Sequence, residues 1–532
     1  MVFGKTNSEG NEILKNLGLK KLFKTKYDLY FSLILLFYIV TVSFLFKYYM
    51  YQINNDGIVY INISRQILEG HFYESISDYW GPLISWLMLP FLYFLKSPLM
   101  GLYSAKLTSI VIGFVTLFGI RRLSYRFEME EWLRTLIILT TVPVIIYFAM
   151  SFITPDLLMV CVLTYYLAAV YDPNYSKTVL NGVFCGFLGA MAYFTKSYGF
   201  TFFIASFLIF NFLHYITEMD KKAVIKNLAV GLLVFLLISS IWICFISYKA
   251  GKITYGSSGE FNYALVGPNS MGFAEYSEGL HNPDQVNTNY LPKEWSPFSS
   301  WTNFQHQLNL IWNGAQKTGK ILNYFSILSF IIIILYILLL ILPPKNVSRV
   351  DLAYPLITMF ILTAGYIIVV VEERYIWLIY LLLILMGGYL LNKLFNLGLF
   401  NSLKWNYLLK IVCIVGSIWL MTLMPVTYLM GNLNTGKDSY ALASTLNGYG
   451  VHGNVATNDE LTEMNYLQYY MNTDLYGQSQ RNISPENLQN DLKLLGINYY
   501  FVWGNSNQNS YMGNYTQVAN LTSYNLVIYK IT

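Results

Sequence analysis

The residues of this sequence that could take part in chemistry are a few ionisable side chains at the edges of long apolar runs. A carboxylate there can take a proton from a hydroxyl group as a general base, whereas a lysine or arginine can bind a phosphate. They come from separate places in the chain, so they line one cavity only if several helix ends cluster. The residues are Asp56, Arg65, Glu69, Glu74, Asp78, Asp156, Lys196, Glu372, Glu373 and Arg374.

Two of the carboxylates also have a structural interpretation. Asp56 follows an apolar run and precedes an amphipathic stretch, so it could cap a surface helix, and residue type alone favours this cap over a general base. Asp156 lies in Thr154-Pro155-Asp156, which is an ordinary helix start with threonine as cap and proline at the first helical position. Both alternatives stay open for each residue.

The two cations have alternatives as well. Lys196 ends one predicted helix before Ser197-Tyr198-Gly199, where a positive charge either complements the helix dipole or holds a phosphate. Arg374 lies in Glu372-Glu373-Arg374-Tyr375, on the predicted face where arginines are scarce. It either pairs with Glu373 and reaches toward the lipid headgroups, or it binds a phosphate.

Membrane-spanning helices must position these residues. Hydrophobic residues make up 55% of the chain and charged residues only 12%, which is about half the charged share of a soluble domain. About eleven apolar runs are long enough to span a bilayer, and we therefore expect an all-α polytopic membrane domain. The runs lie near 28–48, 99–120, 132–150, 154–171, 178–195, 198–216, 224–248, 321–342, 351–371, 375–394 and 407–430.

Positive charge predicts the orientation of these helices. Pro82–Leu95 is about fourteen residues long, which favours an interfacial segment over a crossing. With the N-terminus in the cytoplasm, the basic clusters then fall on the cytoplasmic side of a cell membrane. These clusters are Arg121/Arg122/Arg126, Lys221/Lys222/Lys226, Lys345/Arg349 and Lys393/Lys404.

This orientation sets the predicted domain organisation. Residues 1–27 form a cytoplasmic N-terminus and residues 28–430 form the membrane domain, with external loops at 49–98, which carries juxtamembrane helices, and at 249–320. Residues 431–532 form a small external α/β domain. Its helix-like patterns are Ser439–Leu446, Leu461–Tyr470 and Pro485–Leu495, and its β-like runs are Asn454–Thr457, Tyr499–Trp503 and Leu526–Tyr529.

No metal or cofactor is required by the sequence. The histidines and cysteines are scattered, so no structural metal site is expected. Asp56, Asp78, Asp156 and His71 could gather around a divalent ion, but their spacing does not require one. A net charge of +5 gives no reason to expect a nucleic-acid partner.

A series of short motifs in the chain carries a family resemblance. The motifs are Asp56 with Tyr60 and the surface-helix sequence 62–70, Tyr79-Trp80-Gly81-Pro82-Leu83, Thr154-Pro155-Asp156, Phe194-Thr195-Lys196 and Glu373-Arg374-Tyr375. Their order resembles the polytopic GT-C glycosyltransferases that use polyprenyl-phosphate sugars, especially the group of the protein O-mannosyltransferases and the bacterial lipid A aminoarabinose transferase. Two departures are Gly57, where many relatives carry a second acid, and Ile376-Trp377-Leu378-Ile379, where many carry a proline.

The resemblance implies a reaction and a role for each residue. One hexosyl or pentosyl unit would pass from a polyprenyl monophosphate, such as a dolichyl phosphate, to a hydroxyl of a protein, lipid or glycan at the external face, with inversion. Asp56 and Asp156 would be the catalytic carboxylates, with Asp56 as the general base, and Lys196 and Arg374 would hold the donor phosphate. The supporting residues and the acceptor loop would be Tyr60, Arg65, Asp78, Tyr79, Trp80, Glu373 and Tyr375.

A second function class is a transporter, a flippase or another non-transferase handler of lipid-linked glycans, which could use the same phosphate contacts. Such a protein is expected to have inverted repeats and ionisable residues near the middle of its helices. The sequence shows neither feature, and it therefore favours the transferase.

Overall fold

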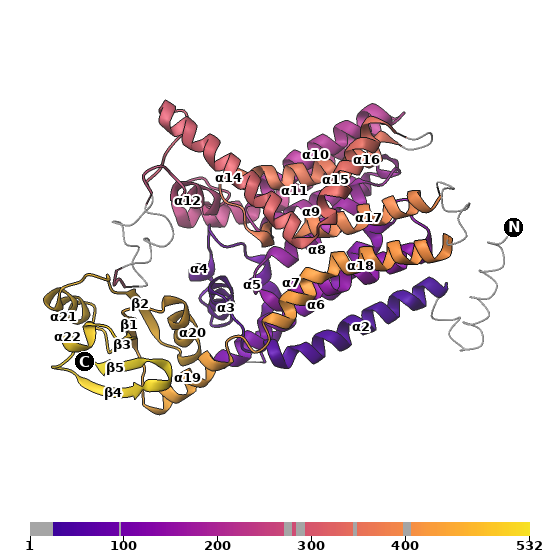
Figure 1. The fold of residues 1–532 in the computed structure, drawn as a ribbon. Coiled ribbons are helices and arrows are strands. Elements are labelled where there is room, and N and C mark those ends of the chain that lie inside the picture. Colours follow the sequence, from indigo (N-terminus) through magenta and orange to yellow (C-terminus); the bar gives the residue numbers. More distant parts are fainter. Residues whose placement is uncertain (1–24, 95–96, 271–278, 283–292, 344–347, 397–405) are drawn as a thin grey trace.

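A bundle of long helices with a small sheet at one end makes up the protein (Figure 1). The computed structural model describes residues 25–94, 97–270, 279–282, 293–343, 348–396 and 406–532. We call the end of the bundle that carries the sheet the domain end, and the other end the opposite end.

Ten of the eleven predicted apolar runs correspond largely to one helix each, and the run at 321–342 divides between two helices. Eight helical stretches of the described chain are long and apolar enough to cross a membrane, whereas α8 and α9 have only 15 and 17 residues. The chain is a multi-pass membrane protein. The helices are α2 (Lys26–Tyr49), α6 (Pro98–Ser124), α7 (Glu131–Ser151), α8 (Asp156–Val170), α9 (Val179–Thr195), α10 (Tyr198–Thr217), α11 (Lys221–Ala250), α15 (Leu328–Ile341), α16 (Arg349–Ile367), α17 (Trp377–Asn396) and α18 (Asn406–Gly431).

The run predicted at 321–342 is broken in the structure. Its first residues belong to α14 (Trp301–Phe325), and α15 then leaves at a bend of 109°. Ser326 adopts an extended conformation at the break and its hydroxyl accepts from the backbone N–H of Leu328, which ends one helix and starts the next. The sequence predicted an external loop over most of α14, because polar residues interrupt its apolar ones.

Short helices cover the domain end of the bundle. They are α3 (Asn55–Leu68), α4 (Phe72–Ser75), α5 (Leu83–Leu92) and α12 (Ser258–Leu265). The ten residues of α5 extend about 15 Å, which is half of the roughly 30 Å hydrocarbon core. This length agrees with the prediction that Pro82–Leu95 does not span.

Helices α9 and α11 approach closely because α9 carries glycines on the contact face. A Cβ atom on Gly182 would lie 2.5 Å from the carbonyl oxygen of Asn227, and one on Gly186 would lie 2.2 Å from that of Gly231. The two backbones therefore touch with no side chain between them, as small-residue motifs in membrane helices allow.

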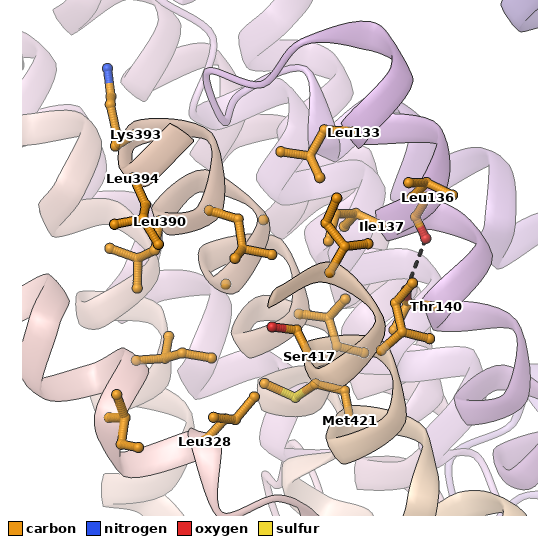
Figure 2. Close-up of a pocket in the computed structure, with 18 of the residues that line it drawn as sticks. Leu133, Leu136, Ile137, Thr140, Leu328, Leu390, Lys393, Leu394, Ser417 and Met421 are labelled. Atoms are coloured by element: carbon orange, nitrogen blue, oxygen red, sulfur yellow. Dashed lines mark hydrogen bonds between the residues drawn. The ribbon is translucent and has the colours of Figure 1, made fainter. Parts of the chain in front are cut away.

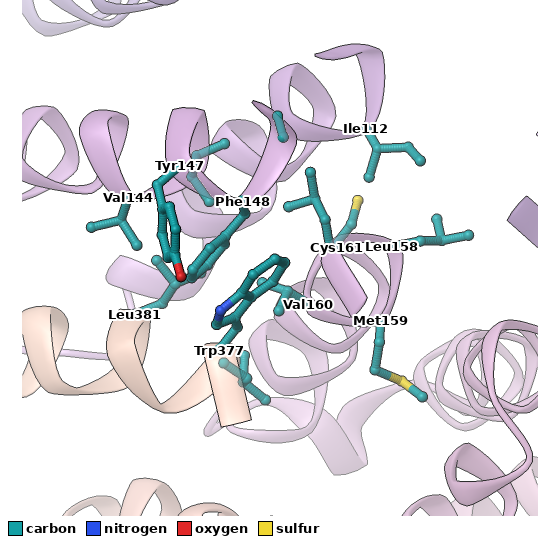
Figure 3. Packing of buried hydrophobic residues seen from close by; sticks show 14 of the residues in the cluster. Ile112, Val144, Tyr147, Phe148, Leu158, Met159, Val160, Cys161, Trp377 and Leu381 are labelled. Atoms are coloured by element: carbon teal, nitrogen blue, oxygen red, sulfur yellow. The ribbon is translucent and has the colours of Figure 1, made fainter. Parts of the chain in front are cut away.

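Aromatic side chains join α7 to α17 in the core of the bundle (Figure 3). Phe148 stacks on Trp377 with ring centroids 4.1 Å apart, and Tyr147 meets the same indole edge-on at 5.8 Å. Trp377 is 1% exposed and begins α17 directly after the short η4 helix (Glu373–Ile376). This packing fixes the position of η4, which carries Arg374.

The C-terminal part is a mixed α/β domain. Its sheet has the strand order β2-β1-β3-β5-β4, in which β1 runs parallel to β2 and β3, while β5 runs antiparallel to β3 and β4. The predicted helices and strands are present, but β2 and β4 were not predicted because both are edge strands with partly exposed, polar sequences. The elements are α19 (Lys437–Gly448), β1 (Asn454–Thr457), α20 (Leu461–Met471), β2 (Asp474–Gln478), α21 (Pro485–Leu494), β3 (Tyr499–Trp503), α22 (Gln508–Tyr511), β4 (Thr516–Leu521), η5 (Thr522–Tyr524) and β5 (Leu526–Lys530).

Hydrogen bonds from α20 attach this domain to the bundle. The hydroxyl of Tyr469 donates to the carbonyl of Pro98 at 2.6 Å, and that of Tyr470 donates to the carbonyl of Tyr51 at 2.5 Å. The ring of Tyr469 also lies under the guanidinium of Arg65, 5.4 Å from its centroid. One helix of the domain is thus fixed against the first external loop.

The close approach of α9 and α11 generates a stability prediction. We expect Gly186→Ala to lower the free energy of unfolding by about 1–3 kcal/mol, because the added methyl group overlaps the carbonyl of Gly231. The measurement is the thermal unfolding midpoint of the purified protein in detergent. Gly416→Ala in α18 is the matched control, since no atom of the described residues lies within 4 Å of its Cβ position, and equal midpoints for the two variants would contradict the prediction.

Candidate functional site

A cavity of about 610 Å³ lies at the domain end of the bundle. Its walls come from the start of α3, the segment before α5, the start of α8, the turn from α9 to α10, the region of α12, and the segment from α16 to α17. The charged residues that line it are Asp56, Asp156, Lys196, Glu260, Glu372 and Arg374. The structure therefore brings together the four residues to which the sequence analysis gave the central roles.

These four residues form one network of alternating charge. Arg374 donates to Asp56 through Nη1, and its Nε lies 3.9 Å from Oδ2 of Asp156. The other carboxylate oxygen of Asp156 accepts from Nζ of Lys196 at 2.5 Å. Asp156 thus stands between the two cations, and Asp56 stands at one end of the network.

The two carboxylates differ in their access to solvent. The side chain of Asp156 is 2% exposed, whereas that of Asp56 is 28% exposed. A buried carboxylate is stable in its charged form only when cations and hydrogen bonds compensate for its lost hydration. Asp156 is therefore suited to orienting the cations, and Asp56 is suited to meeting a molecule that enters from outside.

A side-chain contact explains why the two carboxylates are neighbours. Asn54 is the N-cap residue of α3, and its Oδ1 accepts from the backbone N–H of Ile153 at 2.9 Å. This bond joins the start of α3 to the corner before α8. Asp56 is the second residue of α3, so the prediction that it could be the cap is wrong. Asp156 is the first residue of α8 and Pro155 is its N-cap, so the prediction of Thr154 as cap and proline at the first helical position is wrong by one residue.

Lys196 lies in an unusual environment for a lysine. It follows the last residue of α9, and its Nζ lies 4.0 Å from the centroid of the Tyr375 ring. Burial lowers the pKa of Lys196 below its usual value, and the carboxylate of Asp156 opposes that effect. Arg374 lies over the same ring at 5.4 Å and also contacts Oε2 of Glu372 at 3.2 Å. Tyr375 thus supports both cations.

Aromatic residues of the first loop form another wall of the cavity. Tyr60 packs edge-on against Trp80 at 5.2 Å, and Tyr79 packs against the same indole at 4.8 Å. A Cβ atom on Gly81 would lie 2.2 Å from the carbonyl oxygen of Thr195. Only glycine lets this loop reach the end of α9, beside Lys196.

Comparison with known proteins identifies the fold. No family model and no curated protein matches the sequence. Among solved structures, ArnT from Cupriavidus metallidurans bound to undecaprenyl phosphate is similar over 94% of this chain and 98% of its own, with a TM-score of 0.58 and 12% identity. The oligosaccharyltransferase of Archaeoglobus fulgidus in its apo form is similar over 88% of this chain and 69% of its own, with a TM-score of 0.53 and 10% identity. This chain has the GT-C fold.

Within this GT-C fold, several predicted supporting residues lie outside the cavity. Asp78 is not among the lining residues, and its carbonyl accepts from the backbone N–H of Ser257 at 2.9 Å. Arg65 faces Tyr469 in the contact with the C-terminal domain. Glu373 turns away and accepts from the hydroxyl of Tyr147 at 2.6 Å. These three residues support neighbouring structure, whereas Tyr60, Tyr79, Trp80 and Tyr375 line the cavity.

Residues that were not singled out from the sequence line the GT-C cavity or hold its surrounding helices together. Tyr366 at the end of α16 stacks on Tyr375 at 4.7 Å. Gln307 of α14 accepts from the hydroxyl of Tyr263 at 2.6 Å and donates to the carbonyl of Ile368 at 3.0 Å, which joins α12 to the end of α16. Tyrosine and glutamine are common residues, and no spacing in the sequence distinguishes these positions.

A separate cavity of about 330 Å³ lies among α7, α15, α17 and α18 (Figure 2). Aliphatic side chains make up nearly all of its wall, and the hydroxyl of Thr140 is already bonded to the carbonyl of Leu136. Lys393 lies at its rim and pairs with Glu128. The described lining of this cavity holds no carboxylate or imidazole for acid–base catalysis. In the part of the chain that the structure describes, no three His, Cys, Asp or Glu side chains are grouped so that they could hold a metal ion.

The buried position of Asp156 generates the second prediction. We expect Asp156→Asn to lower the free energy of unfolding by about 3–5 kcal/mol, because it leaves Lys196 and Arg374 without their shared buried anion. Thermal unfolding in detergent measures this loss. Glu128→Gln breaks an ion pair whose carboxylate is 63% exposed, so it should cost less than about 1 kcal/mol. Similar losses of unfolding free energy in both variants would show that the burial of Asp156 does not make its ion pairs more important for stability.

Proposed function

We propose that this protein is a glycosyltransferase that moves one sugar from a polyprenyl-phosphate donor to a hydroxyl group of an acceptor. The observation that carries the proposal is the ion network of Asp56, Arg374, Asp156 and Lys196 at the domain end of a GT-C bundle. One similar structure is described as ArnT bound to undecaprenyl phosphate, and another as the archaeal enzyme AglB in complex with an inhibitory peptide and a dolichol-phosphate. Both descriptions support a lipid-linked donor.

The donor phosphate would bind to Lys196 and Arg374. Both line the larger cavity, and both lie at the ends of apolar helices, where a lipid headgroup meets the protein. Asp156 aligns the two cations and keeps their charges fixed before the donor arrives. Charges that are already oriented stabilise a developing negative charge without reorganisation.

Asp56 would be the general base. Its carboxylate takes the proton of the acceptor hydroxyl, and the hydroxyl oxygen forms a bond to the anomeric carbon of the sugar. The bond from that carbon to the phosphate oxygen breaks, and the electron pair leaves with the phosphate, which Lys196 and Arg374 stabilise. One displacement of this kind inverts the configuration at the anomeric carbon.

The orientation in the membrane follows from charge. Basic residues gather at the opposite end of the bundle, in Arg121, Arg122 and Arg126 and in Lys221, Lys222 and Lys226. The positive-inside rule assigns that end to the cytoplasm and the active site to the external face of the cell membrane. Lys345, Lys404 and most of the cytoplasmic segment predicted at 1–27 lie outside the described residues. A boundary near residue 431 suits the external domain, since α18 ends at Gly431.

A transporter of lipid-linked glycans is less well supported. Charged groups that carry a substrate across a membrane are expected along the middle of the helices. The network described here lies at the helix ends instead. This position favours chemistry at a surface over passage through the bundle.

The role of Asp56 is tested by Asp56→Asn. We expect the variant to fold and to bind the donor lipid, but to lose transfer by at least about a hundredfold, because the amide cannot take the proton of the acceptor. Single-turnover transfer from a radiolabelled polyprenyl-phosphate sugar measures the rate. Glu260→Gln is the control, since Glu260 lines the same cavity but pairs with Lys252 and not with a member of the network. Wild-type turnover by Asp56→Asn would rule out the base assignment.

The donor contacts are tested by Lys196→Ala and Arg374→Ala. Each loses a charge-assisted contact to the phosphate, so we expect binding of a synthetic polyprenyl monophosphate to weaken by about 10- to 100-fold. Binding is measured on protein in lipid nanodiscs. Lys252→Ala is the control, since it removes a lysine at the domain end whose side chain is 58% exposed. Its affinity for the polyprenyl monophosphate should stay within about twofold of the wild-type affinity. Unchanged affinity in all three variants would contradict the phosphate assignment.

A further inference from the structure

A further cavity, of about 340 Å³, adjoins the cavity of about 610 Å³ that holds the ion network, and we call it the second cavity or the smaller cavity of this pair. Three residues line both cavities, namely Asp56, Glu372 and Arg374. The Asp56–Arg374 ion pair therefore belongs to the boundary between the two spaces. A molecule in either cavity can reach the carboxylate of Asp56.

The chemistry of the second cavity differs from that of the first. Lys196 and Arg374 both line the larger cavity, whereas Arg374 is the one cation among the described residues that line the smaller cavity, and it is paired with Asp56. Three carboxylate side chains line the smaller cavity, namely those of Asp56, Glu372 and Glu373. This excess of negative charge disfavours a second phosphate.

Aromatic rings and hydrogen-bonding groups supply the rest of the wall. Tyr147, Phe152 and Tyr466 contribute rings, and Asn55 contributes an amide. A sugar presents hydroxyl groups that donate to carboxylates and bond to amides, and it presents C–H faces that pack on rings. An uncharged saccharide matches this combination of groups.

We propose that the second cavity binds a neutral sugar unit of the acceptor and that α20 of the C-terminal domain forms its outer wall. This inference rests on the proposed function, since it assumes that Asp56 acts on a hydroxyl. The sugar occupies the smaller cavity and presents one hydroxyl to Asp56, while the donor phosphate occupies the larger cavity. The acceptor is thereby a glycan or a glycolipid headgroup.

The position of α20 follows from how it is anchored. Thr462 and Tyr466 line the cavity, and Tyr469 and Tyr470 hydrogen-bond to the bundle from the next turns. Residues spaced by three and four positions share one face of a helix. The face that fixes α20 to the bundle is thus the face that carries Thr462 and Tyr466 over the cavity.

The inner wall of the cavity is rigid. Tyr147 donates to Glu373 at 2.6 Å, and its ring also packs against Tyr428 at 4.8 Å. The neighbouring Phe148 is stacked on Trp377, as Figure 3 shows. A fixed inner wall and a domain-borne outer wall fit a site in which the C-terminal domain contributes to the choice of acceptor.

The test measures saccharide binding to the full-length protein in nanodiscs. The probes are a panel of neutral methyl hexosides and oligosaccharides, observed by saturation-transfer NMR, with a panel of neutral and lysine-containing peptides alongside. We expect the wild type to bind members of the saccharide panel. Tyr466→Ala should weaken that binding by about fivefold or more, because it removes one ring of the wall. Thr462→Trp should block it by filling the space, and it changes an exposed residue.

The control variant is Tyr449→Ala, which removes a tyrosine that is 50% exposed in the same domain and lines neither cavity. It should bind saccharides as the wild type does. Binding of a synthetic polyprenyl monophosphate should stay within about twofold in all three variants. Parallel losses of phosphate binding in Tyr466→Ala and Thr462→Trp would overturn the separation of the two cavities.

Two further results would overturn the inference while leaving the proposed function in place. One is a wild type that binds polyprenyl phosphate through Lys196 but binds no saccharide. The other is Tyr466-dependent binding of peptides in place of saccharides, which would assign the cavity to a protein acceptor. A wild type that binds neither phosphate nor saccharide would remove the proposed function and the inference together.

Discussion

Asp156 is the residue on which the rest of the site depends. A carboxylate that is 2% exposed at the end of apolar helices has lost nearly all of its hydration, and it remains charged only because Lys196 and Arg374 hold it. The same contacts keep the two cations in place, since Asp156 is the carboxylate that pairs with Lys196, and Arg374 would otherwise keep only Asp56 and Glu372 among the described residues. The position of α8 therefore determines where positive charge stands in the cavity, and the segments around it must meet at this point.

Backbone contacts make that meeting possible. The first loop reaches the end of α9 because Gly81 has no side chain that would clash with Thr195. The turn from α9 to α10 is tight for the same reason, since Gly199 has no Cβ atom, and one there would lie 2.2 Å from the carbonyl oxygen of Ala192. Asn54 joins the start of α3 to the corner before α8. The stacked rings of Phe148 and Trp377 fix the position of η4, which Trp377 follows directly in the chain. Each contact acts on backbone position, so the charged side chains arrive already oriented.

The membrane domain could be predicted largely from the sequence, because apolar runs long enough to span give a direct signal. The separation of α14 from α15 could not, since Ser326 breaks a run that composition alone leaves continuous. The residues of the site could also be predicted from the sequence, because few ionisable residues lie at the ends of apolar runs. The pairing of these residues could not be predicted, because Asp56 and Arg374 lie 318 residues apart in the sequence and meet only through helix packing. Asp78 and Arg65 do not line the cavity, because a place in the first loop does not determine which way a residue faces.

The identity of the residue at 374 matters under the proposed function. Its Nη1 serves Asp56, and its Nε serves Glu372 and faces Asp156. A guanidinium has five N–H donors in a fixed plane, whereas a lysine offers a compact charge on a flexible stem. Only the planar group can hold carboxylates on several sides and still direct donors toward a phosphate. Lys196, which contacts one carboxylate and one ring, has the simpler task that a point charge can perform. Arg374 lies at the boundary between the two cavities and Lys196 does not, and this difference in position explains why an arginine suits one place and a lysine the other.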